Sequence, residues 1–92
     1  MSQPQPKTDN KKPTAIIYGA EWCGWCHTAM DYFDQKKVSY IYHDIEKEED
    51  AYNELVKKLG GPVQGVPVLD VNGQVILGYD IGKINAALTQ AA

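Results

Sequence analysis

A Cys-x-x-Cys motif joins an apolar strand pattern to a helical pattern near the start of the chain, and this junction constrains the possible folds most. Residues 15–18 form a continuous apolar run, which is typical of a strand covered on both faces. Beyond them, apolar side chains recur at helical spacing, at Cys26, Ala29, Met30 and Phe33. The sequence therefore predicts a strand at 14–19 and a helix that starts at Cys23 or Gly24 and runs to about Lys37.

Periodic patterns in the rest of the chain predict five further elements. They are strands at 39–43, 66–71 and 74–77, a helix at 46–59, and a last helix that Asp80 can N-cap. Asn72-Gly73, between two of these strands, is the strongest two-residue signal for a hairpin. The order is β-α-β-α-β-β-α, in which the first three elements form a parallel, right-handed unit. The expected fold is therefore α/β, a four-stranded mixed sheet with three helices on its two faces.

Length and composition limit the chain to one small domain and exclude several functions. The chain has 92 residues, of which 1–13 are polar and rich in Pro and Lys, so we expect a disordered tail before one domain at 14–92. A net charge of −3 argues against a nucleic-acid partner. No apolar run approaches the ~20 residues that span a bilayer, and the N-terminus lacks the apolar core of a secretory signal. We therefore expect a cytoplasmic monomer that binds neither membrane nor nucleic acid.

The two cysteines of the chain stand where a reactive dithiol is favoured. In a reducing compartment, a cysteine pair is more often catalytic or metal-binding than structural. At a helix N-terminus, free backbone N–H groups and the helix dipole stabilise a thiolate. The i, i+3 spacing puts both sulfurs on one side of the helix, with Cys23 at the open end, where we expect it to be exposed, and Cys26 one turn inside. These positions predict that Cys23 is the nucleophile and Cys26 the resolving thiol.

Three other roles of this cysteine pair are compatible with the sequence. A tetrahedral zinc site usually takes four ligands, and beside the cysteines the chain offers only His27 and His43. An iron–sulfur cluster needs further cysteines, from a second chain or from glutathione. The third role is a pair of inert, buried cysteines, which the strand–motif–helix context disfavours.

From Thr14 on, the chain resembles the glutaredoxins of the thioredoxin superfamily. Three segments carry the resemblance: Ile17-Tyr18 through Cys23-Gly24-Trp25-Cys26-His27, then Gly65-Val66-Pro67, then Gly78-Tyr79-Asp80. The resemblance implies a thioredoxin-like fold of glutaredoxin type. It also implies a dithiol–disulfide oxidoreductase with no tightly bound cofactor and with glutathione as co-substrate.

The resemblance further implies which residues bind the substrate. Val66-Pro67 is expected to have a cis peptide bond that faces the dithiol, so that the Val66 backbone can pair with a bound peptide or with glutathione. Asp80 is expected to hold the ammonium group of glutathione, while N–H groups at the start of the last helix hold a carboxylate of glutathione.

The residues around the nucleophile give two further expectations of their own. Trp25, between the cysteines, is expected to be exposed and to form an apolar platform for the substrate. Trp22 is expected instead to pack against the edge of the sheet and to shield the dithiol.

The entrance to the active site departs from the pattern that the resemblance implies. Ala20 stands where many glutaredoxins have a Lys that pairs with a glutathione carboxylate, and Ala20-Glu21-Trp22-Cys23-Gly24 looks like the thioredoxin motif. We therefore expect a reductant of protein disulfides or of glutathione mixed disulfides, which accepts electrons from glutathione or from a flavoprotein disulfide reductase. The alternatives are an electron donor that depends on thioredoxin reductase, and a glutathione-assisted iron–sulfur protein, for which Gly24 leaves space beside the nucleophile.

Overall fold

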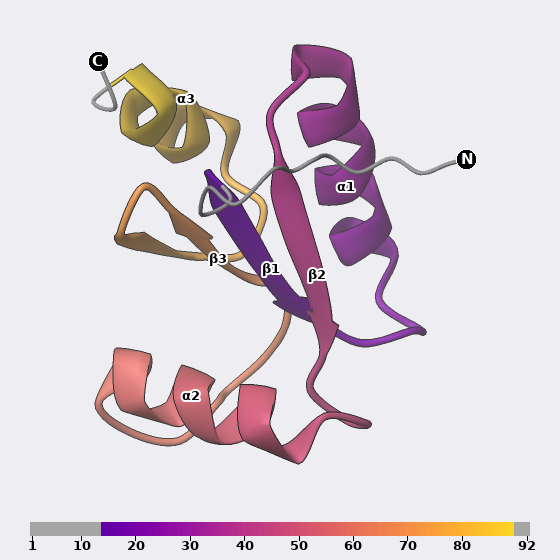
Figure 1. The fold of residues 1–92 in the computed structure, drawn as a ribbon, viewed down its shortest axis with the longest axis vertical. Helices are drawn as coiled ribbons and strands as arrows, with labels where there is room; N and C mark the ends of the chain where they lie inside the picture. The colour runs from indigo at the N-terminus through magenta and orange to yellow at the C-terminus, as the bar shows by residue number, and fades with distance from the viewer. Residues whose placement is uncertain (1–13, 90–92) are drawn as a thin grey trace.

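The computed structural model describes residues 14–89, and the predicted N-terminal tail lies outside the described residues (Figure 1). Seven elements follow one another in the predicted order. They are β1 (Ala15–Gly19), α1 (Gly24–Lys36), β2 (Tyr40–Asp44), α2 (Glu49–Leu59), β3 (Val68–Val71), β4 (Gln74–Leu77) and α3 (Ile81–Thr89). No helix within residues 14–89 is long and apolar enough to cross a membrane.

The four strands form one mixed sheet in the order β2-β1-β3-β4. β1 is parallel to β2 and antiparallel to β3, and β3 is antiparallel to β4. The predicted four-stranded mixed sheet is therefore confirmed, with β1 at its interior. This position explains the unbroken apolar run at residues 15–18, because an interior strand is covered on both faces.

The helices cover the two faces of the sheet unequally. α1 and α3 pack on one face, where the buried side chains are Ala15, Ile17, Ala29, Phe33, Leu69, Val71, Ile76, Ile84 and Ala87. α2 covers the other face through a smaller cluster of Tyr18, Ala51, Leu55 and Val68. In Figure 1, α2 accordingly lies apart from α1 and α3, at the bottom of the view. The alternation of side chains along β1 sends Ile17 to the first face and Tyr18 to the second.

Two local signals in the second half of the chain are confirmed. Asn72 and Gly73 have positive φ values of 52° and 88°, as a tight two-residue hairpin requires, and the Gly73 N–H donates to Asp70 Oδ1 at 3.0 Å. Asp80 caps α3, because its Oδ1 accepts a hydrogen bond from the Lys83 N–H at 3.1 Å. The hairpin orders the chain before Gly78 and the cap orders the chain after it, next to the candidate site.

The predicted start of the second helix at residue 46 is wrong by three residues. Side chains hold residues 44–48 in a turn instead: Asp44 Oδ1 accepts from the Glu46 N–H at 2.9 Å, and Glu48 Oε2 accepts from the Asp44 N–H at 3.1 Å. Acidic side chains near a helix start compete for backbone N–H groups in this way. The third strand also begins later than predicted, at Val68, after the Val66–Pro67 bond.

Candidate active site

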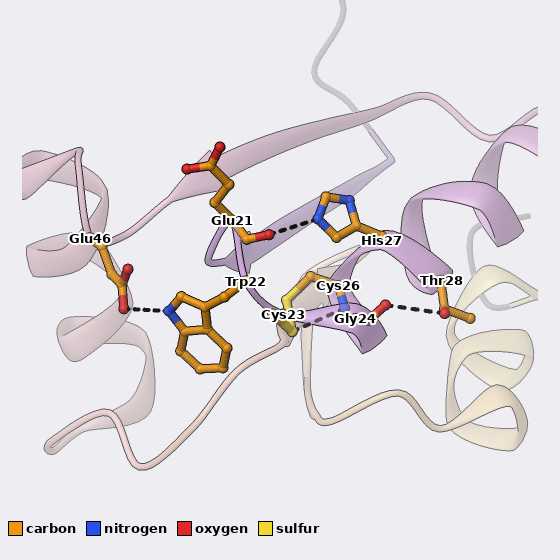
Figure 2. Close-up of a disulfide and its surroundings, with 8 residues drawn as sticks. All are labelled: Glu21, Trp22, Cys23, Gly24, Cys26, His27, Thr28 and Glu46. Carbon is orange, nitrogen blue, oxygen red and sulfur yellow. Dashed lines mark hydrogen bonds between the residues drawn. A yellow bond between two sulfur atoms is a disulfide. The ribbon is translucent and has the colours of Figure 1, made fainter.

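Cys23 and Cys26 form a disulfide at the N-terminus of α1 (Figure 2). Cys23 is the N-cap residue of this helix, and its sulfur accepts a hydrogen bond from the Cys26 N–H at 3.1 Å. The turn that leads from β1 is closed by the Cys23 N–H, which donates to the Ala20 carbonyl at 3.0 Å. The interior strand and the helix start thus hold the first sulfur at a free backbone N–H.

The two cysteines are both buried, and the expectation that Cys23 is exposed is wrong. Cys26 is 0% exposed and Cys23 only 4%. Ala20 is buried with them, and Val66 and Tyr42 pack against this cluster. The sulfur of Cys23 is bonded to Cys26, and Val66, from a segment far away in sequence, packs against the cluster that contains both cysteines.

The loop before β3 completes this side of the site. The Val66–Pro67 peptide bond is cis, as predicted, and Val66 contacts the cysteine cluster. The Pro67 carbonyl accepts a hydrogen bond from the Gly78 N–H at 2.9 Å, which ties this loop to the segment before α3. A groove of about 510 Å³ follows the loop, with Val66, Pro67, Leu77 and Gly78 among its lining residues.

Trp25 is 63% exposed, as predicted, and it lies against the segment that precedes α3. Its indole stacks on the Tyr79 ring, with 5.7 Å between centroids and 21° between planes. Tyr79 in turn meets Tyr32 edge-to-face at 6.1 Å. Asp80 follows Tyr79 directly, so the stack connects the helix start that carries the cysteines to the predicted glutathione residue. Of the predicted site residues, the structure thus brings Cys23, Cys26 and Val66 into contact, with Pro67, Trp25 and Asp80 on adjoining segments.

The prediction that Trp22 shields the dithiol is wrong, because the Trp22 side chain is 69% exposed. Its Nε1–H donates a hydrogen bond to Glu46 Oε2 at 2.9 Å (Figure 2). A second link joins the same two loops, an ion pair between Lys47 Nζ and Glu21 Oε1 at 3.2 Å. The turn after β2, which the sequence pattern assigned to a helix, therefore holds Trp22 at the surface beside the cysteines.

His27 stabilises the loop from the helix side. Its Nε2 lies 3.0 Å from the Glu21 carbonyl oxygen (Figure 2). Because a carbonyl only accepts, the Nε2 nitrogen carries the proton in this contact. His27 is exposed, and its ring is directed to the backbone of the loop.

Sequence reasoning missed two residues beneath the disulfide, Gly19 and Tyr42. A Cβ at Gly19 would lie 2.5 Å from Cys26 Sγ and 3.0 Å from Cys26 Cβ, so only glycine fits there. A glycine at the end of a buried strand is a known signal for such a close approach. Tyr42 contacts the cluster from β2, and its hydroxyl is buried without a hydrogen-bond partner. No sequence signal marks Tyr42, since a tyrosine in an alternating strand pattern is common.

Side chains of the metal-ligating types do not gather into a cluster among residues 14–89. No group of three or more His, Cys, Asp or Glu side chains comes together within that range. The two cysteines, which would be the first ligands of a zinc site, are bonded to each other.

Comparisons with known proteins give a family. The glutaredoxin family model matches residues 15–76. A protein described as an uncharacterized glutaredoxin-like 8.6 kDa protein in the rubredoxin operon of Clostridium pasteurianum is 28% identical over 72 residues, which cover 75% of this chain and 89% of that protein.

Solved structures share the fold. The thioredoxin-like protein BC3987 has a TM-score of 0.72 at 23% identity and covers 80% of this chain and 99% of its own. The glutaredoxin of Archaeoglobus fulgidus reaches 0.69 at 18% identity, over 83% of this chain and 86% of its own. The buckwheat glutaredoxin–glutathione complex reaches 0.63 at 24% identity, over 85% and 78%. The fold is thus thioredoxin-like, and because the family model spans well over half of the sequence, the chain belongs to the glutaredoxin family.

Proposed function

We propose that this protein is a dithiol–disulfide oxidoreductase that reduces protein disulfides or glutathione mixed disulfides. The observation that carries the proposal is the Cys23–Cys26 disulfide at the start of α1, against Val66 of the cis-proline loop. Membership of the glutaredoxin family supports thiol–disulfide exchange as the reaction class.

In the reduced protein, Cys23 is the nucleophile because the helix start stabilises its thiolate. The Cys26 N–H already donates to the Cys23 sulfur in the disulfide, and the same donor stabilises a negative charge on that sulfur. The helix dipole acts in the same direction. Both contributions lower the free energy of the thiolate relative to the thiol.

The reaction proceeds in two exchanges. The Cys23 thiolate attacks one sulfur of the substrate disulfide, the substrate S–S bond breaks, and the other substrate sulfur leaves as a thiolate. The Cys26 thiolate then attacks the Cys23 sulfur, which releases the second substrate thiolate and forms the Cys23–Cys26 disulfide. The substrate gains two electrons and the protein loses two. Two equivalents of glutathione, or a flavoprotein reductase, return the protein to the dithiol.

Substrate binding is assigned to three segments around the cysteines. The Val66 backbone pairs with an extended peptide, the exposed face of Trp25 supports apolar substrate groups, and Asp80 binds the ammonium group of glutathione. One carboxylate oxygen of Asp80 caps α3, and the other is available to a ligand, since a carboxylate has several acceptor sites. Ala20 is 1% exposed and offers no charge, so a carboxylate of glutathione lacks a cation at this position.

Two coupled assays test the proposal and separate the electron donors. The first measures reduction of a small glutathione mixed disulfide with glutathione, glutathione reductase and NADPH. The second measures insulin reduction with thioredoxin reductase and NADPH. Cys23→Ser is the matched control in both. Turnover that disappears with Cys23→Ser in either assay supports the proposal, and the absence of Cys23-dependent turnover in both contradicts it. Activity in the second assay alone removes the ligand role of Asp80.

A further inference from the structure

Tyr42 lies beside the disulfide, in the strand next to β1. It is the central residue of β2, opposite Ile17 of β1, and its ring packs against the cluster of Cys23, Cys26 and Ala20. The absence of a side chain at Gly19 brings the ring close. A Cβ at Gly19 would lie 2.5 Å from Cys26 Sγ and 3.2 Å from Tyr42 Cε1. The Cys26 sulfur and the hydroxyl-bearing half of the Tyr42 ring therefore border the same small space.

The Tyr42 hydroxyl is buried without a partner. Among the side-chain nitrogen and oxygen atoms of residues 14–89, it is the one that is both buried and without a hydrogen bond. Buried polar groups are nearly always hydrogen-bonded, and one without a partner destabilises the state that contains it. An unpartnered hydroxyl in the oxidised protein suggests that its hydrogen bond forms in another redox state.

The two sulfurs differ in their hydrogen bonds. The Cys23 sulfur accepts from the Cys26 N–H, whereas no hydrogen bond within residues 14–89 reaches the Cys26 sulfur. Cys26 is also 0% exposed, so water does not surround it. When the disulfide opens, Cys26 becomes a buried thiol or thiolate, and a buried anion needs a donor.

Tyr42 remains a donor over the physiological pH range. Burial raises the pKa of Tyr42 above its ordinary value of 10.0, and the Asp44 and Glu21 carboxylates add to this effect. Lys47 opposes it, and Glu46 contributes weakly in the same direction as the other carboxylates. The phenol therefore stays neutral and offers its O–H, and it does not act as a base.

We propose that the Tyr42 hydroxyl donates a hydrogen bond to the Cys26 sulfur once the disulfide is open, and so stabilises the reduced protein. The Cys26 sulfur already borders Gly19, and opening the disulfide frees this side chain to turn about χ1 toward the Tyr42 hydroxyl. When a reductant thiolate attacks Cys23, the Cys23–Cys26 bond breaks and its electron pair passes to the Cys26 sulfur. Tyr42 donates to the resulting thiolate without transferring its proton. Tyr42 is thus a positioning residue, and the inference rests on the proposed role of Cys26.

The test is the dithiol–disulfide equilibrium of the full chain in glutathione redox buffers. Tyr42→Phe keeps the ring and removes the hydroxyl, which relieves the unpartnered group of the oxidised state and removes the donor of the reduced state. Both changes favour the disulfide. We expect the equilibrium constant to shift about tenfold toward the disulfide, which is a potential about 30 mV more negative.

Tyr40→Phe is the matched control. Tyr40 lies two residues earlier in β2, and its ring packs against Phe33, 5.9 Å between centroids, within the core formed with α1 and α3. We expect the redox equilibrium of Tyr40→Phe to equal that of the wild type. An equal shift in both variants would contradict a specific role of the Tyr42 hydroxyl.

A second measurement isolates the Cys26 thiol. In a Cys23→Ser background, thiolate absorbance in the ultraviolet follows the ionisation of Cys26 against pH. Adding Tyr42→Phe should raise the midpoint by about one pH unit, because the thiolate loses its donor. An unchanged redox equilibrium and an unchanged midpoint would overturn the inference, as would a variant whose two redox states lose stability equally. Neither measurement needs turnover, so inactivity in the coupled assays would count against the proposed function alone.

Discussion

The two sulfurs of one disulfide have different surroundings. Exposed side chains flank Cys23: Trp22 is 69% exposed and Trp25 63%. We call these two tryptophans the rim. Beneath Cys26 lie the buried Gly19 and the partly buried Tyr42, which we call the floor. The two sulfurs are covalently bonded and therefore adjacent. Their surroundings differ because different segments of the chain lie next to each sulfur.

Different surroundings for the two sulfurs allow a small domain to separate substrate recognition from redox control. An exposed side chain contributes little to stability and much to contacts with a partner. A buried one contributes to packing, and a small change in its volume is felt by its neighbours. We therefore expect substitutions at the rim to change substrate affinity, and substitutions at the floor to change stability or the redox equilibrium.

The largest expected effect divides the two cysteines themselves. Cys23→Ser should reduce turnover to background in both coupled assays, because the remaining thiol, Cys26, is 0% exposed and out of reach of the substrate. Cys26→Ser should abolish reduction of protein disulfides but keep reduction of glutathione mixed disulfides, which requires one thiol only. The measurement is NADPH oxidation by each variant. Equal loss in both variants with both substrates would contradict the division of roles.

At the floor, Gly19→Ala should destabilise the protein by about 1–3 kcal/mol, because the new methyl group overlaps the Cys26 sulfur. Denaturant unfolding measures this change. Gly24→Ala is the matched control, since a Cβ at Gly24 meets nothing within 4 Å and alanine is favoured in the first turn of a helix. A Gly19→Ala variant as stable as Gly24→Ala would show that the floor is not closely packed.

Local sequence signals sufficed for much of the fold and part of the site. The hairpin at Asn72-Gly73, the Asp80 cap and the position of the cysteines at a helix start each depend on a few neighbouring residues. The cis Val66–Pro67 bond followed from a resemblance over spaced motifs, and it is confirmed.

The remaining features depend on contacts between distant segments. Trp22 is held outward by Glu46, 24 residues away, and Val66 packs against the buried cluster that contains Cys23. The turn that presents Glu46 interrupts a pattern that reads as helix from sequence alone. Periodicity reports which face of an element is apolar, but not which atom of another element meets it.

At the rim, Trp25→Ala should raise the KM for a protein substrate about fivefold, which corresponds to about 1 kcal/mol of lost contact. Its stability should change little, because the side chain is mostly exposed and loses mainly the stack on Tyr79. Tyr52→Ala, an exposed aromatic residue of α2 on the other face, serves as the control with an unchanged KM. A Trp25→Ala variant with wild-type KM would remove this tryptophan from the substrate site.

The smallest expected effect concerns the hydrogen bond from Trp22 to Glu46. In a double-mutant cycle of Trp22→Phe and Glu46→Gln, the coupling energy for unfolding should lie below about 1 kcal/mol, because both side chains are exposed. The coupling should fall further in high salt, since the acceptor is a carboxylate. A coupling energy well above this limit, unaffected by salt, would mean that Trp22 contributes to stability as the floor residues do.

Trapping the mixed disulfide shows which cysteine attacks the substrate. Cys26→Ser and Cys23→Ser are each incubated with a peptide disulfide, quenched with acid and analysed by mass spectrometry after digestion. We expect a stable peptide adduct on Cys23 in the Cys26→Ser protein and almost none on Cys26 in the Cys23→Ser protein. An adduct that forms faster on Cys26 than on Cys23 would contradict the assignment of nucleophile and resolving thiol.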